Sequence, residues 1–367
     1  MVYAPLTRCR ALGTVPCKAA QTYYRQRTVK SGLLLTEATC INPQAHGYPN
    51  TPGLYTEAQL AAWKPIVNAV HKAGGIFFAQ LWHVGRASHS VYQPDNTPPV
   101  GPSAIAIPAS QPCMLPDTSM TAYPVPRELT KEEIQGIVKD YADAAHNAVE
   151  AGFDGVEIHS ANGYLIEQFL RQTSNHRSDE YGGSIPNRCR FCLEVAEAVT
   201  AKVGAAKVGI RLSPYNTFLQ DGLDEDGVEL MMYLVKELAK LKLLYLHCIE
   251  PRSSTGHVDV EPPPDQTLLP FRKAWPGAFL AAGGFTKPLG DEAIKDGAVD
   301  LVVFGRWWLA NPDLPERFVE GAALNKYDRK TFYSPDPVKG YTDYPFLDQI
   351  KPGTPTRTHY SGTKIYA

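Results

Sequence analysis

The sequence predicts a (β/α)8 barrel, and three observations indicate this fold. Short apolar runs recur eight times along the chain. Segments in which apolar residues repeat with helical spacing separate most of these runs. The runs are continuously apolar, which is typical of strands that a parallel sheet buries on both faces. A length of 367 residues suits one barrel with insertions.

The apolar runs are the predicted barrel strands. They span residues 2–5, 32–37, 75–80, 155–159, 208–212, 243–247, 278–283 and 300–305. Alternation of such runs with helices predicts parallel strands joined by crossover helices. Eight repeats of this unit predict a closed barrel rather than an open sheet.

The helix with the clearest boundaries is predicted over residues 131–151, where the apolar residues have the spacing of one helical face. Thr130 and Glu133 form a capping-box pattern at its start, and Gly152 is typical of the residue that follows a helix. Two further helices are predicted over residues 55–73 and 224–240.

Two segments interrupt the alternation. Residues 86–127 are rich in Pro, Ser and Ala without a helical repeat, and residues 325–367 are rich in Tyr and Pro. Loops that follow barrel strands lie at the active-site face, and loops of this length are commonly functional. We therefore expect a single domain over residues 1–367, with residues 86–127 as a lid and residues 325–367 as a C-terminal tail.

Composition narrows the classes of function. The net charge of −2 is spread along the chain, which does not favour a nucleic-acid-binding protein. No stretch reaches the roughly 18 apolar residues of a membrane span.

The seven cysteines predict reduced thiols, and the isolated CxxC of Cys189 and Cys192 predicts no metal site. The first residues resemble no signal or transit peptide, so a cytoplasmic location is expected. Both a monomer and a homodimer remain open.

The carboxyl ends of the last two strands predict a phosphate site. Residues at these ends face the active site of a barrel. Gly283 and Gly284 would let backbone amides approach a phosphate closely, and Gly305 and Arg306 would add amides and a bidentate cation. The alternative is that these glycines only form turns.

Polar side chains also follow the fourth and fifth strands. His159 and Asn162 can donate two hydrogen bonds to one oxygen, and Tyr164 can supply a proton. The alternative for His159 is a histidine of the core. Arg211 ends a buried strand and requires an anionic or polar partner. The partner is either a cofactor that develops negative charge or, in a structural ion pair, Glu157 or another strand carboxylate.

A barrel hydrolase is a competing class of enzyme. Glu37, Glu157 and Glu250 lie near strand ends and are candidates for the carboxylate pair of a glycoside hydrolase. The sequence does not fix their separation. Such a hydrolase would be colourless.

Longer motifs resemble the Old Yellow Enzyme family of flavin-dependent ene-reductases. The resemblance covers essentially the whole chain and is most specific over residues 155–169. The other matching segments are residues 4–8, 36–39, 80–86, 175–184, 282–285 and 304–307, and residues 326–333 and 340–346 are similar to plant-type 12-oxophytodienoate reductases. The resemblance implies a (β/α)8 barrel with non-covalent FMN that NADPH reduces.

The resemblance also implies a role for individual positions. Those that would contact the flavin ring are Pro5, Leu6, Thr7, Ala38 and Gln80, with Arg211 near N1 and O2. Those that would hold the phosphate are Gly283, Gly284, Gly305 and Arg306. Those that would line the substrate pocket are Tyr48, Phe218 and Tyr333.

The implied reaction is a ping-pong reduction of the C=C bond of α,β-unsaturated carbonyl compounds, such as 12-oxophytodienoate-like enones. NADPH would deliver hydride to flavin N5, which would pass it to the β-carbon. His159 and Asn162 would hold the carbonyl oxygen while Tyr164 protonates the α-carbon from the opposite face. The physiological substrate, the stereopreference and the choice between NADPH and NADH stay open.

The sequence departs from the family at its start. The usual N-terminal hairpin is not recognisable, which implies an open barrel floor or a truncated sequence. A flavin-binding barrel with impaired turnover is therefore a further alternative to an active ene-reductase.

Overall fold

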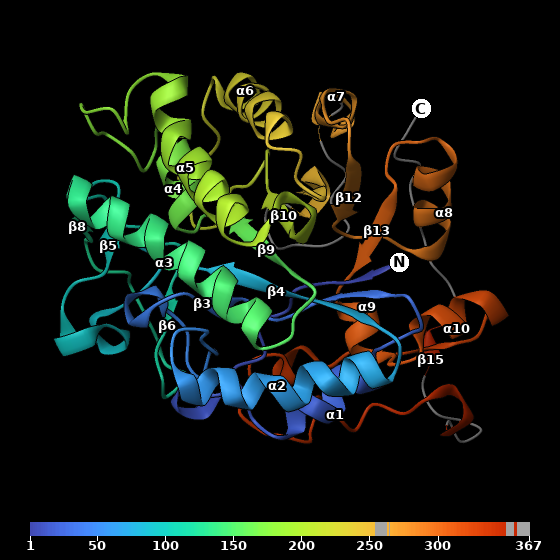
Figure 1. Ribbon diagram of the computed structural model, residues 1–367. Coiled ribbons are helices and arrows are strands. Elements are labelled where there is room, and N and C mark those ends of the chain that lie inside the picture. The colour runs from blue at the N-terminus through green and yellow to red at the C-terminus, as the bar shows by residue number, and fades with distance from the viewer. Residues whose placement is uncertain (254–262, 264, 350–355, 358–367) are drawn as a thin grey trace.

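The computed structural model describes residues 1–253, 263, 265–349 and 356–357, and within them eight parallel strands close into a barrel (Figure 1). Strand β1 pairs with both β2 and β13, which closes the ring and confirms the predicted fold. The barrel strands are β1 (Val2–Tyr3), β2 (Leu33–Leu35), β4 (Ile76–Trp82), β9 (Gly155–Ser160), β10 (Val208–Leu212), β11 (Tyr245–Ile249), β12 (Ala278–Ala282) and β13 (Leu301–Phe304).

A strand lies at each predicted run, but β4 and β11 each extend two residues further than predicted. β4 continues beyond Gln80, because Leu81 and Trp82 remain fully buried and pair with the short strand β3 (Thr39–Cys40). β11 ends at Ile249, so His247 lies inside the strand and not at its end. In both cases burial of the following residues prolongs the ladder.

The barrel interior has an apolar side and a polar side. The apolar side contains a compact cluster of buried residues: Val2, Ala4, Leu35, Phe78, Tyr245, Leu280, Ala282 and Val303. On the polar side, Gln80 pairs in register with Glu157, and Arg211 pairs with His247. Residues in register on parallel strands point to the same face, so these four side chains share one sector of the interior.

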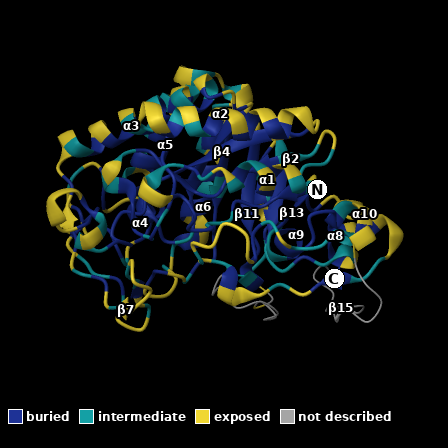
Figure 2. Cartoon of the chain, turned by 90° about the horizontal axis from the view of Figure 1, so that it is seen from below, coloured by how far each residue is buried: buried dark blue, intermediate teal, exposed yellow. Residues whose placement is uncertain are grey.

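Most of the helices form the outer layer, with their buried faces against the barrel and their exposed faces outward (Figure 2), whereas the short helix α4 is buried throughout. The α-helices are α1 (Ala19–Gln26), α2 (Glu57–Lys72), α3 (Lys131–Glu150), α4 (Leu165–Leu170), α5 (Ile185–Val203), α6 (Gly227–Lys240), α7 (Leu269–Ala274), α8 (Lys287–Lys295), α9 (Arg306–Ala310) and α10 (Leu314–Glu320). Short 3-10 helices lie at Leu12–Thr14, Pro43–Ala45, Ser90–Tyr92, Pro94–Asn96, Ala205–Lys207, Pro251–Ser253, Arg329–Thr331 and Leu347–Gln349. Of the helices described, none is both long and apolar enough to cross a membrane.

The predicted helices are present. The Thr130–Glu133 capping box begins α3, and Gly152 follows it with a φ of +99°. Helix α2 also begins with a capping box. Helix α6 begins three residues later than predicted, because the Asp224 carboxylate accepts hydrogen bonds from Gln172 N and Thr173 N and lies outside the helix.

The segment of residues 86–127 forms short strands and turns. Its strands are β5 (Val100–Gly101), β6 (Cys113–Met114) and β7 (Met120–Thr121), and β8 (Arg127–Glu128) lies at its end. Strands β6 and β7 form a hairpin. Gln111 bonds to the loop after β10, where its amide accepts from Leu219 N and donates to Gln220 O at 2.9 Å. This contact ties the segment to the carboxyl end of the barrel, and its role as a lid remains a prediction.

Arg8 and Arg10, in the loop after β1, hold the C-terminal tail through its main chain. Arg8 donates to Gly340 O at 2.7 Å. Arg10 donates to the carbonyl oxygens of Thr331, Asp336 and Lys339 at 3.0, 2.7 and 3.1 Å. Further along, β14 (Leu324–Asn325) pairs with β15 (Thr356–Arg357), and residues 350–355 and 358–367 of the predicted tail lie outside the described residues.

A cavity of about 520 Å³ lies at the amino ends of the barrel strands. Apolar residues line it, among them Met1, Leu33, Ile76, Ala278 and Leu301. This floor is on the opposite side of the barrel from the strand ends that carry the predicted site.

We expect Arg10→Met to lower the free energy of unfolding by about 3 kcal/mol, because three main-chain carbonyls of the tail, including that of the buried Thr331, lose their donor. Urea denaturation measures the change. Arg25→Ala replaces an exposed arginine of α1 and should change stability by less than about 0.5 kcal/mol. Equal stabilities of the Arg10→Met and Arg25→Ala variants would show that the arginine does not anchor the tail.

Candidate active site

Two adjoining pockets open at the carboxyl ends of the strands. The first, which we call the glycine pocket, has a volume of about 260 Å³ and is lined mainly by residues 282–285 and 303–307. The second, the tyrosine pocket, has a volume of about 1030 Å³ and contains four tyrosines: Tyr48, Tyr123, Tyr164 and Tyr333. Six residues line both pockets, so the two form one continuous site: Pro5, Leu6, Asn162, Arg211, Ser253 and Arg306.

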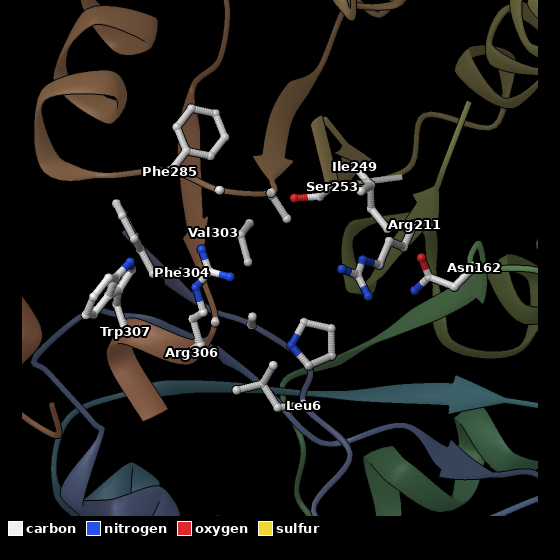
Figure 3. Close-up of a pocket in the computed structure, with 16 residues that line it drawn as sticks. Leu6, Asn162, Arg211, Ile249, Ser253, Phe285, Val303, Phe304, Arg306 and Trp307 are labelled. Atoms are coloured by element: carbon white, nitrogen blue, oxygen red, sulfur yellow. The ribbon is translucent and has the colours of Figure 1, made fainter. Parts of the chain in front are cut away.

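The glycine pocket depends on backbone that only glycine adopts easily. Gly283 has a φ of +120°, and a Cβ at this residue would lie 2.8 Å from Ser253 Oγ. Figure 3 shows the side chains of Arg306 and Arg211 approaching the pocket from opposite sides. Two cations beside a cradle without side chains suit an anionic ligand that carries a phosphate.

Arg211 lies between the two pockets, and no described residue accepts a hydrogen bond from its buried Nε. The predicted alternative of an ion pair with Glu157 is wrong. The Glu157 carboxylate instead accepts from Gln80 Nε2 at 2.7 Å and binds His247 Nδ1 at 2.9 Å. Arg211 therefore has donor capacity to offer to a ligand.

Glu157 lies at 0% exposure below the site. Burial acts to raise its pKa, but His247, Arg211 and the Gln80 hydrogen bond together lower the pKa below its ordinary value. The carboxylate is therefore ionised at neutral pH. Its hydrogen bond also holds the Gln80 amide at the edge of the tyrosine pocket.

His159 is a neutral hydrogen-bond donor. Burial, followed by the charges of Arg211 and His247, holds its pKa well below the ordinary value. The Ala161 amide donates to His159 Nδ1 at 3.3 Å, so the single ring hydrogen of the neutral imidazole is on Nε2. This N–H is the group that His159 can donate in the tyrosine pocket.

The turn after β9 fixes Asn162 and Tyr164 beside His159. Asn162 has a φ of +58°, and its main-chain N–H donates to Ser213 Oγ at 2.8 Å. The Tyr164 ring lies edge-on to His159 at 5.1 Å and to Trp82 at 4.9 Å. Burial raises the pKa of Tyr164, which keeps its hydroxyl protonated.

The structure brings together all the residues predicted for the site. Those in the glycine pocket are Pro5, Leu6, Asn162, Arg211, Gly283, Gly284, Gly305 and Arg306. Those in the tyrosine pocket also include Thr7, Ala38, Tyr48, Gln80, His159, Tyr164, Phe218 and Tyr333. Their functional roles remain predictions.

Sequence reasoning missed Trp82, Ser253 and Tyr123, which line the same pockets. Trp82 lies two residues after the predicted end of a strand, a position that signals the site in a barrel. Ser253 follows β11 on the adjoining 3-10 turn. Tyr123 lies in the segment of residues 86–127, where no pattern marks individual positions.

The three carboxylates of the hydrolase alternative, Glu37, Glu157 and Glu250, line neither pocket. Glu37 accepts a hydrogen bond from Arg8 N, and Glu157 is bonded to Gln80 and His247 inside the barrel. No glutamate or aspartate occurs among the described residues that line the two pockets. The geometry therefore contradicts a carboxylate-pair hydrolase.

The sequence over residues 1–325 matches the NADH:flavin oxidoreductase / NADH oxidase family. The chain belongs to this family. It is therefore a flavin oxidoreductase, and the predicted resemblance to the Old Yellow Enzyme is confirmed.

The relatives are similar along almost their whole length. 12-Oxophytodienoate reductase 1 of Oryza sativa subsp. japonica is 52% identical over 95% of this chain and 90% of its own length. 12-Oxophytodienoate reductase 2 of Arabidopsis thaliana is 51% identical over 95% of this chain and 92% of its own. The chain is similar to both along nearly the whole predicted domain.

Solved structures have the same fold. Morphinone reductase in complex with tetrahydroNAD superposes with a TM-score of 0.87 at 44% sequence identity. The superposition covers 95% of this chain and 93% of the morphinone reductase chain. The Old Yellow Enzyme homologue from Zymomonas mobilis gives a TM-score of 0.87 at 39% identity, covering 95% of both chains. These likenesses support the barrel assignment independently of the strand pattern.

We expect Gly283→Ala to weaken flavin binding at least about tenfold, or about 1.4 kcal/mol, because the new methyl group would collide with Ser253, which lines the pocket, and force the backbone of the cradle to shift. Quenching of flavin fluorescence on binding measures the affinity. Gly297→Ala is the matched control, since Gly297 also has a positive φ of +69° but no atom within 4 Å of an added Cβ. A similar loss of affinity in both variants would refute the cradle.

Proposed function

We propose that this chain is an ene-reductase that reduces the C=C bond of α,β-unsaturated carbonyl compounds with NADPH through non-covalent FMN. The observation that carries the proposal is the convergence of His159, Asn162 and Tyr164 on one pocket beside Arg211. The names of its relatives favour cyclic enones such as 12-oxophytodienoate as substrates. The small-molecule partners of the proposed reaction are therefore NADPH and an enone.

The glycine pocket supports FMN as the cofactor. The main chain at Gly283, Gly284 and Gly305, together with Arg306, would hold its phosphate. The groups that would border its ring are Pro5, Leu6, Thr7, Ala38 and Gln80. When bound, FMN supplies hydride transfer between two substrates that bind in turn.

Arg211 is the residue that would stabilise negative charge on the ring. Its Nε is buried without a described partner, and a buried guanidinium gains free energy from an anionic acceptor. The ionised Glu157 nearby balances part of its charge. The arginine can therefore respond to charge that appears during the reaction without being fully neutralised beforehand.

His159 and Asn162 would hold the carbonyl oxygen of the enone. Both can donate a hydrogen bond to the same oxygen, and negative charge increases on this oxygen as the alkene is reduced. Because the imidazole is neutral, it donates without losing its proton. The hydrogen bonds therefore strengthen as the reaction proceeds.

Tyr164 would protonate the α-carbon. Its O–H group is kept protonated by burial and lies beside the two donors. Phe218 and Tyr333, which are 39% and 51% exposed, form aromatic walls of the same pocket. These walls suit an apolar ring on the substrate.

The test is the flavin spectrum of the purified protein. We expect anaerobic NADPH to bleach it and 2-cyclohexenone to restore it. Tyr164→Phe should be reduced by NADPH as fast as the wild type but be reoxidised by the enone about 100-fold more slowly, because the proton donor is lost. A barrel with impaired turnover would not be bleached by NADPH, and a protein that binds no FMN would end the proposal.

Tyr233→Phe is the control for this substitution, since Tyr233 lies on α6 and lines neither pocket. It should leave both half-reactions at wild-type rates. Equal reoxidation of the Tyr164→Phe and Tyr233→Phe variants would remove Tyr164 from the mechanism.

The neutral state of His159 predicts a flat pH profile. Its pKa is lowered, so the imidazole stays neutral between about pH 6 and 8, and reoxidation by the enone should keep a constant rate there. If an imidazolium with an ordinary pKa were the donor, the rate would fall as the pH rises through about 6.5. Stopped-flow measurements of the oxidative half-reaction distinguish the two.

A further inference from the structure

Three tyrosines, Tyr48, Tyr123 and Tyr164, line one part of the tyrosine pocket with their hydroxyls near one another. The hydroxyl oxygens of Tyr164 and Tyr48 are 3.2 Å apart. Tyr123 lines the same pocket as Tyr48 and Tyr164, and its hydroxyl lies near enough to that of Tyr48 for each to influence the pKa of the other. The three residues come from separate parts of the chain: the loop after β3, the segment of residues 86–127, and the turn after β9.

Packing fixes the position of Tyr48, which lies between the other two tyrosines. The Tyr48 ring stacks on Trp82, with centroids 5.6 Å apart and planes inclined by 23°. Trp82 in turn meets the edge of Tyr164 at 4.9 Å. A tyrosine hydroxyl has one hydrogen to donate and lone pairs to accept, so Tyr48 can accept from one neighbour while donating to the other. In such an arrangement a proton can pass from one tyrosine hydroxyl to the next.

The proposed function creates a need for such a chain. Once Tyr164 has given its proton to carbon, its oxygen is an anion in a buried site. Burial raises the pKa of Tyr164, so this anion is a strong base and is costly while it persists. Tyr48 is the described side chain whose hydrogen bond to Tyr164 is available to relieve the charge.

We propose that Tyr48 and Tyr123 form a proton relay that reprotonates Tyr164 as the enone is reduced. This inference rests on the proposed function and extends it. The Tyr164 O–H bond breaks as the C–H bond forms on the α-carbon. The Tyr48 proton passes to Tyr164, and the Tyr123 proton passes to Tyr48. Tyr123 then takes a proton from water, which leaves hydroxide in the solvent.

The relay gives the segment of residues 86–127 a part in the chemistry. Tyr123 lies two residues after β7 and is 6% exposed. The same segment is held to the loop after β10 through Gln111. The position of this segment therefore determines whether the hydroxyl chain is complete.

Tyr123→Phe is the decisive variant, because Tyr48 is also a predicted substrate contact. The FMN-loaded enzyme should be reduced by NADPH at the wild-type rate and be reoxidised by 2-cyclohexenone at least about tenfold more slowly. Ferricyanide takes electrons from the reduced flavin without placing a proton on carbon. It should therefore reoxidise the Tyr123→Phe variant at the wild-type rate, and this result would show that the fold and the flavin of the variant are intact. Wild-type reoxidation by the enone would overturn the relay.

The matched control is Tyr92→Phe. Tyr92 lies in the same segment, but its hydroxyl donates to Met114 O at 2.6 Å and has no place in the chain. It should retain the wild-type rate with the enone. If Tyr92→Phe slows the enone reaction as much as Tyr123→Phe does, loosening of the segment explains both and the relay is refuted.

A proton inventory provides a readout that a structural role would not change. In mixtures of H2O and D2O the wild-type oxidative rate should depend on the deuterium fraction along a curve, because several protons move together. Tyr123→Phe should bring the plot closer to a straight line. An unchanged curve would contradict the relay.

Failure of the relay and failure of the proposed function can be told apart. Slow reoxidation of Tyr164→Phe together with wild-type reoxidation of Tyr123→Phe would refute the relay alone. Wild-type reoxidation of Tyr164→Phe would refute the role of Tyr164 as proton donor, and the relay with it.

Discussion

Pairing of β1 with β13 is the contact on which the site depends. Val2 pairs with Val303 and Tyr3 with Phe304, and Ala4 N donates to Phe304 O at 3.1 Å. This register delivers the chain after β1 directly beside the chain after β13. Residues about 300 positions apart therefore border the same two pockets, and a barrel that failed to close would have neither.

Four polar residues inside the barrel, Gln80, Glu157, Arg211 and His247, determine how the hydrogen-bond donors of the site are oriented. A buried carboxylate is costly unless it is hydrogen-bonded, and Glu157 satisfies this need with Gln80 and His247. These bonds leave Arg211 without a tight partner while keeping a counter-charge close to it. The donors Gln80 and Arg211 are thus held in place before any ligand binds. Donors that are already oriented stabilise charge on a ligand effectively, because they need no rearrangement during the reaction.

The features that a periodic pattern encodes could be predicted from the sequence. The apolar runs located each barrel strand, and the apolar face and capping box located α3. The ends of β4 and β11 were misjudged, because ladder length depends on burial by neighbouring elements. Tyr123 could not be predicted, because its place depends on the path of an irregular segment. The partners of Arg10 are main-chain carbonyls, which leave no trace in the sequence.

The anchoring of the tail has an evolutionary consequence. Because Arg8 and Arg10 bind the carbonyl oxygens of the tail, they impose a main-chain path but no side-chain identity on most of its positions. Tyr333 lies on this path and forms part of the pocket wall. Mutations in the tail can therefore diversify the range of compounds accepted while the anchor persists, and the tail is a natural region for directed evolution of selectivity.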